Sequence, residues 1–182
     1  MTIFPDDATE AFEPVTGVSV TLRPLRPEDR DIEHAFVSGL SAESRHNRLL
    51  GGARAITRDY IESLVNVDYS RDMAIAASAM LDAETLIGVA RYVLDRDDES
   101  AEFAIVVADS WQGRGIGTRL LAKLADVARQ RGLRRLYGDI LGINRPMLEL
   151  VRKLGFTLSR HDDPTLTRAS FQFRTAPPSS AA

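Results

Sequence analysis

Hydrophobic and polar positions change their period along this 182-residue chain, and the changes outline its elements. Residues 18–23 (VSVTLR) alternate between apolar and polar, which is typical of a half-buried strand, and Pro24 ends that run. Segments with helical spacing follow, beginning at Pro27, near Ser41 and at Thr57. The first part of the chain is therefore predicted as a strand followed by short helices.

The middle of the chain has the period of strands. Residues 72–81, 86–94 and 101–107 are apolar runs joined by the short polar connections DAET and DRDDES, which favours an antiparallel meander. The later elements alternate between helix and strand: a helix at 118–131, a strand at 135–141, a helix that begins at Asn144 and ends before Gly155, and a strand at 166–173. The pattern predicts one domain of mixed α/β type.

Composition supports a single domain with a sizeable core, because 44% of the residues are hydrophobic and 27% are charged. Residues 1–17 and 175–182 are rich in small, polar, proline and acidic residues, which predicts flexible ends around a domain at 18–174. The net charge of −3 gives no general attraction to nucleic acid or to an anionic membrane. No apolar run approaches the roughly 18 residues of a membrane span, so we expect a soluble, cytoplasmic protein.

Cysteine is absent, which removes disulfides, thiolate metal sites and a cysteine nucleophile from consideration. The three histidines, His34, His46 and His161, are widely separated and fit no metal-ligand spacing. The sequence therefore predicts no metal cofactor.

The segment 102–117, EFAIVVADSWQGRGIG, places one carboxylate in an apolar strand directly before a glycine-rich turn. The glycines allow a tight turn that presents successive N–H groups, and the helix from Thr118 adds unpaired N–H groups and the positive end of its dipole. A pyrophosphate fits such a place. The predicted contacts come from the turn and the start of the helix: Gly113, Arg114, Gly115, Ile116, Gly117 and Thr118.

Two familiar phosphate-binding patterns match this turn less well. The Walker loop is excluded, because no Gly-Lys-Ser/Thr follows at the required spacing. The dinucleotide fingerprint fits at Gly113 and Gly115, but Thr118 replaces its third glycine, and the 43 residues after Asp139 are too few for the second half of that fold. A turn whose glycines serve only the backbone is the bland alternative.

Several elements, in this order, resemble the GCN5-related N-acetyltransferase (GNAT) superfamily over residues 18–173. They are the strand with Glu102, the motif Gln112-x-x-Gly115-x-Gly117, Asn144 after the next strand, and the sequence Lys153-Leu154-Gly155-Phe156. The resemblance implies a mixed, mostly antiparallel central sheet with helices on both faces. It also implies a splayed pair of parallel strands, here 101–107 and 135–141, that admits the pantetheine arm of acetyl-CoA, while the Gln112 turn binds the pyrophosphate.

A narrower resemblance concerns residues 22–49, 67–77 and 100–117, which look like the acetyltransferase domain of bacterial Pat-type protein lysine acetyltransferases. It implies that a protein lysine is the acceptor. A small-molecule amine, such as a polyamine, an antibiotic or an amino acid, is the alternative. A non-catalytic module that binds CoA is a third possibility from another class.

The chemistry of amide formation points to Glu102. A lysine ammonium has a pKa of about 10.4, so it must lose a proton before it attacks a thioester. Glu102 is the acid in the apolar strand before the turn, and it matches the glutamate assigned as general base in Pat-type enzymes. Burial there is expected to raise its pKa; the alternative is a strand-end carboxylate that faces water. Without cysteine, direct transfer in a ternary complex is the simpler route.

The remaining site residues also come from the resemblance. Backbone N–H groups of Ile105, Val106 and Val107 are the expected donors to the oxyanion. Asn144 is expected to contact the pantetheine region, and it also suits a helix N-cap. Many relatives carry a tyrosine that protonates the leaving thiolate where this chain has Val151. The arginines that border the expected acceptor site are Arg45, Arg48, Arg54 and Arg58.

Overall fold

A computed structural model describes residues 9–173 and places eight strands of this region in one sheet, in the order β1-β2-β3-β4-β5-β6-β8-β7. The strands are β1 (Glu10–Val15), β2 (Val18–Pro24), β3 (Met73–Met80), β4 (Glu84–Leu94), β5 (Ser100–Val107), β6 (Arg135–Leu141), β7 (Thr157–Arg160) and β8 (Leu166–Gln172). The helices are α1 (Arg30–Gly39), α2 (Ala42–Arg48), α3 (Arg58–Val65), α4 (Ile116–Gln130) and α5 (Arg145–Lys153), with single 3₁₀ turns η2 (Pro27–Asp29) and η3 (Asp109–Trp111).

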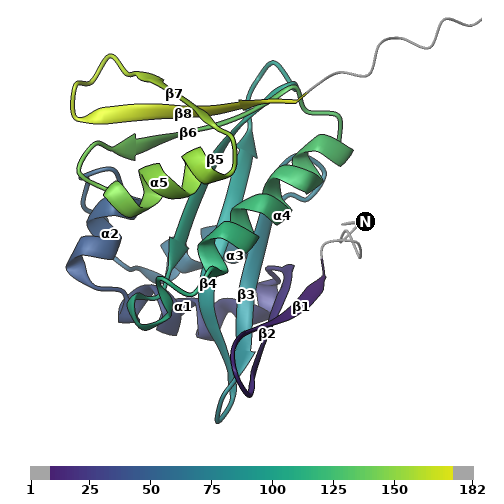
Figure 1. The fold of residues 1–182 in the computed structure, drawn as a ribbon. Helices are drawn as coiled ribbons and strands as arrows, with labels where there is room; N and C mark the ends of the chain where they lie inside the picture. Colours follow the sequence, from purple (N-terminus) through teal and green to yellow (C-terminus); the bar gives the residue numbers. More distant parts are fainter. Residues whose placement is uncertain (1–8, 174–182) are drawn as a thin grey trace, which may run out of the picture.

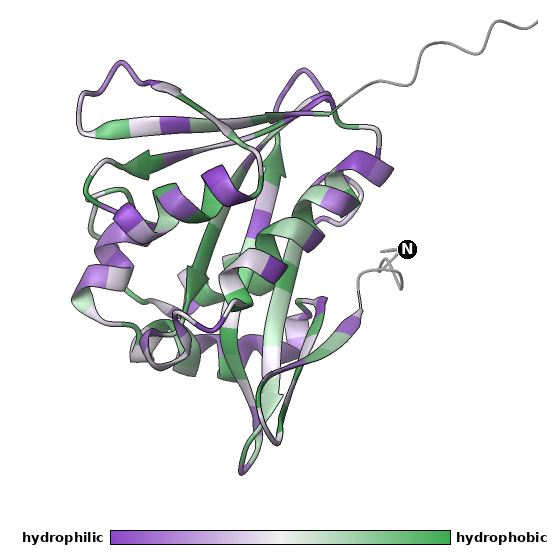
Figure 2. Ribbon diagram, viewed as in Figure 1, coloured by the Kyte–Doolittle hydropathy of each residue, from purple (hydrophilic) through white to green (hydrophobic). Residues whose placement is uncertain are grey.

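Helices cover both faces of the sheet (Figure 1): α4 and α5 lie on one face, and α1 and α3 on the other. The strands and the inward sides of the helices are apolar, whereas the outward sides are hydrophilic (Figure 2). The larger core cluster lies under α4 and α5, and a second cluster lies under α1 and α3. None of the helices between residues 9 and 173 has the length and apolar character that a membrane span requires.

The predicted sheet is confirmed. All neighbouring strands pair antiparallel except β5 and β6, which pair in parallel, and β3, β4 and β5 form the expected meander. Thr57 caps α3 as predicted, since its side chain accepts a hydrogen bond from the Tyr60 N–H. Most predicted bounds differ by one or two residues; α4, for example, begins at Ile116 and not at the expected Thr118. The short strand β7 was not predicted.

The structure corrects the expectation for the N-terminal end. Residues 1–17 were predicted to be flexible, but Glu10–Val15 form β1 and pair with β2. Phe12 packs against the larger core, and the Arg119 guanidinium lies 4.5 Å above its ring. The Arg119 Nη1 atom also lies 2.9 Å from Glu10 Oε1. Long-range contacts thus hold a strand that the acidic composition did not indicate. Residues 1–8 and the predicted tail 175–182 lie outside the described part of the chain.

The parallel pair separates soon after it forms. Pairing between β5 and β6 runs from Ser100↔Arg135 to Glu102↔Tyr137 and stops there. The next residue of β6 is Gly138, where an added Cβ would lie 2.8 Å from a Phe103 ring carbon and 2.9 Å from the Phe103 carbonyl oxygen. The strands therefore part at Glu102, and Gly138 permits the close approach at that point.

We expect Gly138→Ala to lower the free energy of unfolding by about 1–3 kcal/mol, the usual cost of overpacking. Both the ring and the backbone of Phe103 would have to move. Urea denaturation measures the change. Gly142→Ala is the matched control, because its added Cβ would lie at 3.4 Å from the Thr165 carbonyl oxygen, an ordinary contact. Equal losses in the two variants would contradict this explanation.

Candidate active site

The glycine-rich turn after β5 leads directly into α4. Gly113 and Gly115 have φ angles of 72° and 80°, the left-handed region that favours glycine, and an added Cβ at either would meet no atom within 4 Å. The first hydrogen bond of α4 runs from the Arg119 N–H to the Gly115 carbonyl at 3.1 Å. The N–H groups of residues 116–118 come before it and therefore have no acceptor within the helix. The turn therefore offers open space beside unpaired donors at the positive end of a helix, as a pyrophosphate requires.

Polar side chains fasten this turn to β5 and to α2. The Gln112 side-chain amide donates to the Val107 carbonyl at 3.0 Å and to Ser44 Oγ at 3.1 Å. The Asp109 carboxylate accepts from the Ser41 N–H at 2.9 Å, from Ser41 Oγ at 2.6 Å and from Ser44 Oγ at 2.8 Å. Gln112 thus holds the turn in place by its side chain. The bridge from Asp109 to α2 was missed by the sequence analysis, because it joins residues far apart in the chain.

Two other residues of the turn have contacts of their own. An added Cβ at Gly117 would lie 3.0 Å from a Leu150 methyl group, so Gly117 keeps α4 close to α5. The Arg114 guanidinium lies 5.1 Å from the centroid of the Trp111 ring. The side chain of Ile116 is buried in the larger core, which leaves its backbone at the start of α4.

Asn144 and Val151 lie at the two ends of α5. The Asn144 side chain accepts a hydrogen bond from the Met147 N–H at 3.3 Å, so the N-cap interpretation is confirmed. Val151 is 0% exposed and belongs to the larger core. Its position therefore supplies no hydroxyl group to a leaving thiolate.

Beyond Glu102, β5 and β6 no longer pair, and we call the space between them the gap. The backbone N–H groups of β5 point alternately toward β4 and toward this gap. The Ala108 N–H donates to the Ile87 carbonyl of β4, and Val106 stands opposite Val89 in the same ladder. In an antiparallel pair the backbone groups alternate in direction, so the N–H groups of Val106 and Ala108 point toward β4. Those of Ile105 and Val107 point toward the gap, which suits two of the three predicted oxyanion donors.

Glu102 differs from the expectation of a buried carboxylate, because its side chain is exposed between the buried Ala101 and Phe103. It projects from β5 to the face opposite α4. The pKa of Glu102 is nevertheless raised, first by partial loss of solvent around the carboxyl and then by the negative charges of Asp139 and Asp95. A carboxyl with a raised pKa is a stronger base than an ordinary glutamate.

The pKa of Asp139, which lies near Glu102 on β6, is shifted in the opposite direction. Arg168 donates to both of its carboxylate oxygens at 2.8 Å, and His161 Nε2 lies 3.3 Å from one of them. The hydrogen bonds from Arg168 lower the pKa of Asp139. Asp139 therefore stays ionised and keeps its negative charge beside Glu102. Of the two acids, Glu102 is the one suited to accept a proton.

A cavity of about 30 Å³ lies between α1, α2, α3 and the strands β4 and β5. It has room for about two water molecules. Apolar side chains make up much of its wall, and its charged lining consists of Glu33, Arg45, Arg48, Arg54 and Arg91. Three of the four arginines predicted near the acceptor site are thus brought together.

The fourth predicted arginine, Arg58, lies elsewhere and donates from Nε to Glu62 Oε1 at 2.8 Å. Glu33 and Arg91 were missed, because Glu33 stands on a helix with many charges and Arg91 interrupts an apolar strand. Only the fold brings these two residues together. Among residues 9–173, no group of three or more histidine, aspartate or glutamate side chains is arranged to hold a metal ion.

Residues 57–156 match the acetyltransferase (GNAT) family. The chain is 36% identical over 148 residues to acetyltransferase PA5475 of Pseudomonas aeruginosa, covering 81% of this chain and 80% of that protein. It is 31% identical over 148 residues to acetyltransferase Pat of Mycolicibacterium smegmatis, covering 81% of this chain but 44% of Pat. The GNAT domain of S. lividans PAT has the same fold, with a TM-score of 0.84 and 24% identity, covering 94% of this chain and 100% of that domain.

Proposed function

We propose that this protein, which belongs to the acetyltransferase (GNAT) family and uses acetyl-CoA, passes the acetyl group directly to a primary amine, with Glu102 as the general base. The observation that carries this proposal is the place of Glu102. Its carboxyl has a raised pKa, is open to an approaching amine, and stands where β5 and β6 separate.

The donor would occupy the turn and the gap. Its pyrophosphate would bind the N–H groups of residues 116–118 beside Gly113 and Gly115, whose backbone conformations leave open space. Its pantetheine arm would lie between β5 and β6, with Asn144 as a contact at the start of α5. The N–H groups of Ile105 and Val107 point to this gap and would polarise the thioester carbonyl.

The reaction follows from these positions. An ammonium gives a proton to Glu102, and the neutral amine attacks the thioester carbon. The amide C–N bond forms as the C–S bond breaks, the nitrogen releases its second proton to water, and the sulfur leaves as a thiolate. A thiol has a pKa of about 8.5, so a thiolate leaves without a protein acid and takes its proton from water. This route accounts for Val151 at the position where relatives carry tyrosine.

A protein lysine is the acceptor that we propose first. The support is the resemblance of residues 22–49 and 67–77 to Pat-type enzymes, together with the open position of Glu102. The negative charges of Asp95 and Asp139 near Glu102 favour a cationic amine. A small amine that also carries an anionic group is the second candidate, favoured by the arginines of the cavity.

Incubation with labelled acetyl-CoA, a cell lysate and a panel of small amines tests the acceptor. We expect labelled lysine residues on proteins above the chemical background. Efficient acetylation of one small amine, with proteins left unlabelled, would favour the second candidate. If acetyl-CoA binds but no amine is acetylated, the chain is a CoA-binding module and the proposed function is wrong.

A further inference from the structure

The cavity and Glu102 lie on the same face of the sheet. Val106, which lines the cavity, is separated from Glu102 by four positions of β5, and residues two or four apart on a strand share a face. Arg91 of β4 stands opposite Ala104, midway between them. With a rise of about 3.3 Å per residue, Glu102 is roughly 7 Å along the strand from that point. A molecule of modest length can therefore reach both places.

The cavity holds a carboxyl oxygen without a partner. Glu33 is 2% exposed, and its Oε2 atom makes no hydrogen bond to any part of the described chain. Its other oxygen, Oε1, lies 3.8 Å from Arg91 Nη2, which is too far for a hydrogen bond. A buried polar atom left in this way costs free energy, so it calls for an explanation such as a missing ligand.

The guanidinium groups of the cavity are also incompletely paired. Arg91 donates from Nη1 to the Leu64 carbonyl at 3.3 Å, and within residues 9–173 its one ion-pair contact is the distant one with Glu33. Arg48 makes no side-chain hydrogen bond within residues 9–173. The pKa of Arg48 is lowered, first by burial and then by the positive charge of Arg91. Two cations are thus held close together in a site of low solvent content.

Four guanidinium groups line the cavity, against the single carboxyl of Glu33. Burial is the largest influence on its carboxyl and raises its pKa, which favours the uncharged form. This excess of guanidinium groups gives the cavity the charge and the donors that an anion requires.

We propose that this cavity is a carboxylate-binding subsite for the acceptor, in which the guanidinium groups of Arg48 and Arg91 bind a carboxylate of the molecule whose amine lies at Glu102. The inference rests on the proposed function, since it assigns the class of acceptor for that same reaction. The cavity has room for the two oxygens of a carboxylate, since it can hold about two water molecules.

The carboxylate that binds this subsite can come from two kinds of acceptor. It belongs either to a small amino acid or to an acidic side chain beside the target lysine of a protein. Both place a carboxylate at a distance from a primary amine, and both fit two guanidinium groups that bind it by charge-assisted hydrogen bonds. The two kinds of acceptor differ in what carries the carboxylate, and matched acceptors distinguish them below.

Titration with sodium acetate tests the subsite without acetyl transfer. We expect acetate to shift the arginine Nε–Hε signals in NMR spectra of the wild-type protein. Arg48→Met should weaken acetate binding about tenfold or more, because it removes a charged donor. Arg48→Gln is a second variant in case the first folds poorly. Arg58→Met is the matched control, since Arg58 is exposed and pairs with Glu62 outside the cavity.

Methylammonium chloride is the opposite probe. If the cavity is a cation site formed by Glu33, methylammonium will shift the signals of the cavity and Glu33→Gln will abolish that shift. That result would overturn the proposal. The proposal predicts no methylammonium binding there and retained acetate binding in Glu33→Gln, because this variant keeps Arg48 and Arg91.

Matched acceptors separate the two sources. One pair is 6-aminohexanoate and 6-aminohexanamide, and the other is a lysine peptide with either glutamate or glutamine beside the lysine. We expect kcat/KM to favour the charged member of at least one pair about tenfold, and Arg48→Met but not Arg58→Met to remove that preference. Equal values within both pairs would overturn the subsite. Acetate binding with no turnover of any amine would instead contradict the proposed function alone.

Discussion

Glu102→Gln is expected to lower the rate of acetyl transfer by about 10²-fold or more, the usual contribution of a general base. The amide keeps the size of the side chain but cannot accept the proton of the ammonium. Acetyl-CoA affinity should stay unchanged, because the glycine turn and the backbone of β5 are untouched. Steady-state kinetics together with calorimetric titration of acetyl-CoA separate these two effects.

The pH profile gives a second measurement of the same variant. The base acts only when ionised, and the pKa of Glu102 is raised, so wild-type kcat/KM should begin its acidic fall at a higher pH than an ordinary glutamate would give. Protonation of the acceptor amine adds to this fall in both proteins. In Glu102→Gln only the contribution of the amine should persist, and the acidic fall should be less steep.

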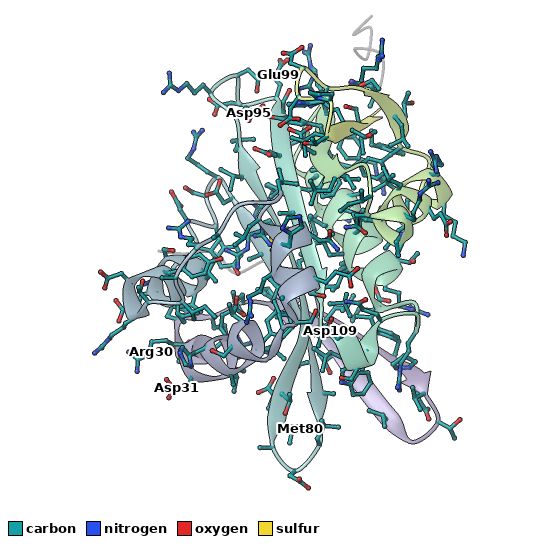
Figure 3. The ribbon with its side chains drawn as sticks, turned by 90° about the vertical axis from the view of Figure 1, so that its left-hand side faces the viewer. Arg30, Asp31, Met80, Asp95, Glu99 and Asp109 are labelled. Carbon is teal, nitrogen blue, oxygen red and sulfur yellow. The ribbon has the colours of Figure 1, made fainter. Side chains whose placement is uncertain are left out.

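Glu99→Gln is the matched control for Glu102→Gln. Glu99 immediately precedes β5, and its carboxylate lies 3.3 Å from Arg134 Nη2 at the far end of the strand (Figure 3). Its loss should leave turnover within about twofold of the wild type, as expected for an exposed ion pair. Equal turnover in Glu102→Gln and the wild-type protein would make Glu102 a structural residue.

Gly115→Glu is expected to weaken acetyl-CoA binding by about 10²-fold or more. The new carboxylate would stand beside the unpaired N–H groups of α4, where it would satisfy them itself and repel the pyrophosphate. Calorimetric titration measures the affinity. Gly115→Gln separates the two causes, since it has similar bulk without the charge and should bind more tightly than the glutamate variant.

Gly132→Glu controls for strain in this comparison. Gly132 follows α4 at its other end, has the same φ of 80°, and has the same open space beside it. Both glutamate variants therefore lose similar stability from a left-handed backbone, but only the one at Gly115 should lose acetyl-CoA. If the two variants bind acetyl-CoA equally well, the pyrophosphate site lies elsewhere.

Local patterns were sufficient for much of this fold. Residues 135–141 form a strand with the predicted bounds, and Thr57 and Asn144 cap their helices, because each of these depends on neighbours within a few positions. The parallel pairing of 101–107 with 135–141 was available only through the resemblance to a known superfamily. Spacing alone does not say which strands become neighbours.

The acceptor side depended on contacts that no local pattern contains. Glu33 and Arg91 are separated by most of the N-terminal half of the chain, and Asp109 bonds to Ser41 and Ser44 across a similar separation. The exposure of Glu102 was also not predictable from the local sequence pattern. Its apolar surroundings in the sequence predicted burial, but the strand turns alternate residues outward and leaves this one in reach of solvent.

The early separation of β5 from β6 gives the sheet a free edge in the middle of the molecule. From Phe103 to Val107, β5 has a partner strand on its β4 side, and β6 no longer pairs with it on the other. Free edges on a protein surface invite other chains to add a strand. Here the edge lies on the side of β5 toward β6, and the Gln112 amide already donates to its last carbonyl, that of Val107. An elongated ligand with its own amide groups can serve as the absent strand and complete the sheet while it is bound.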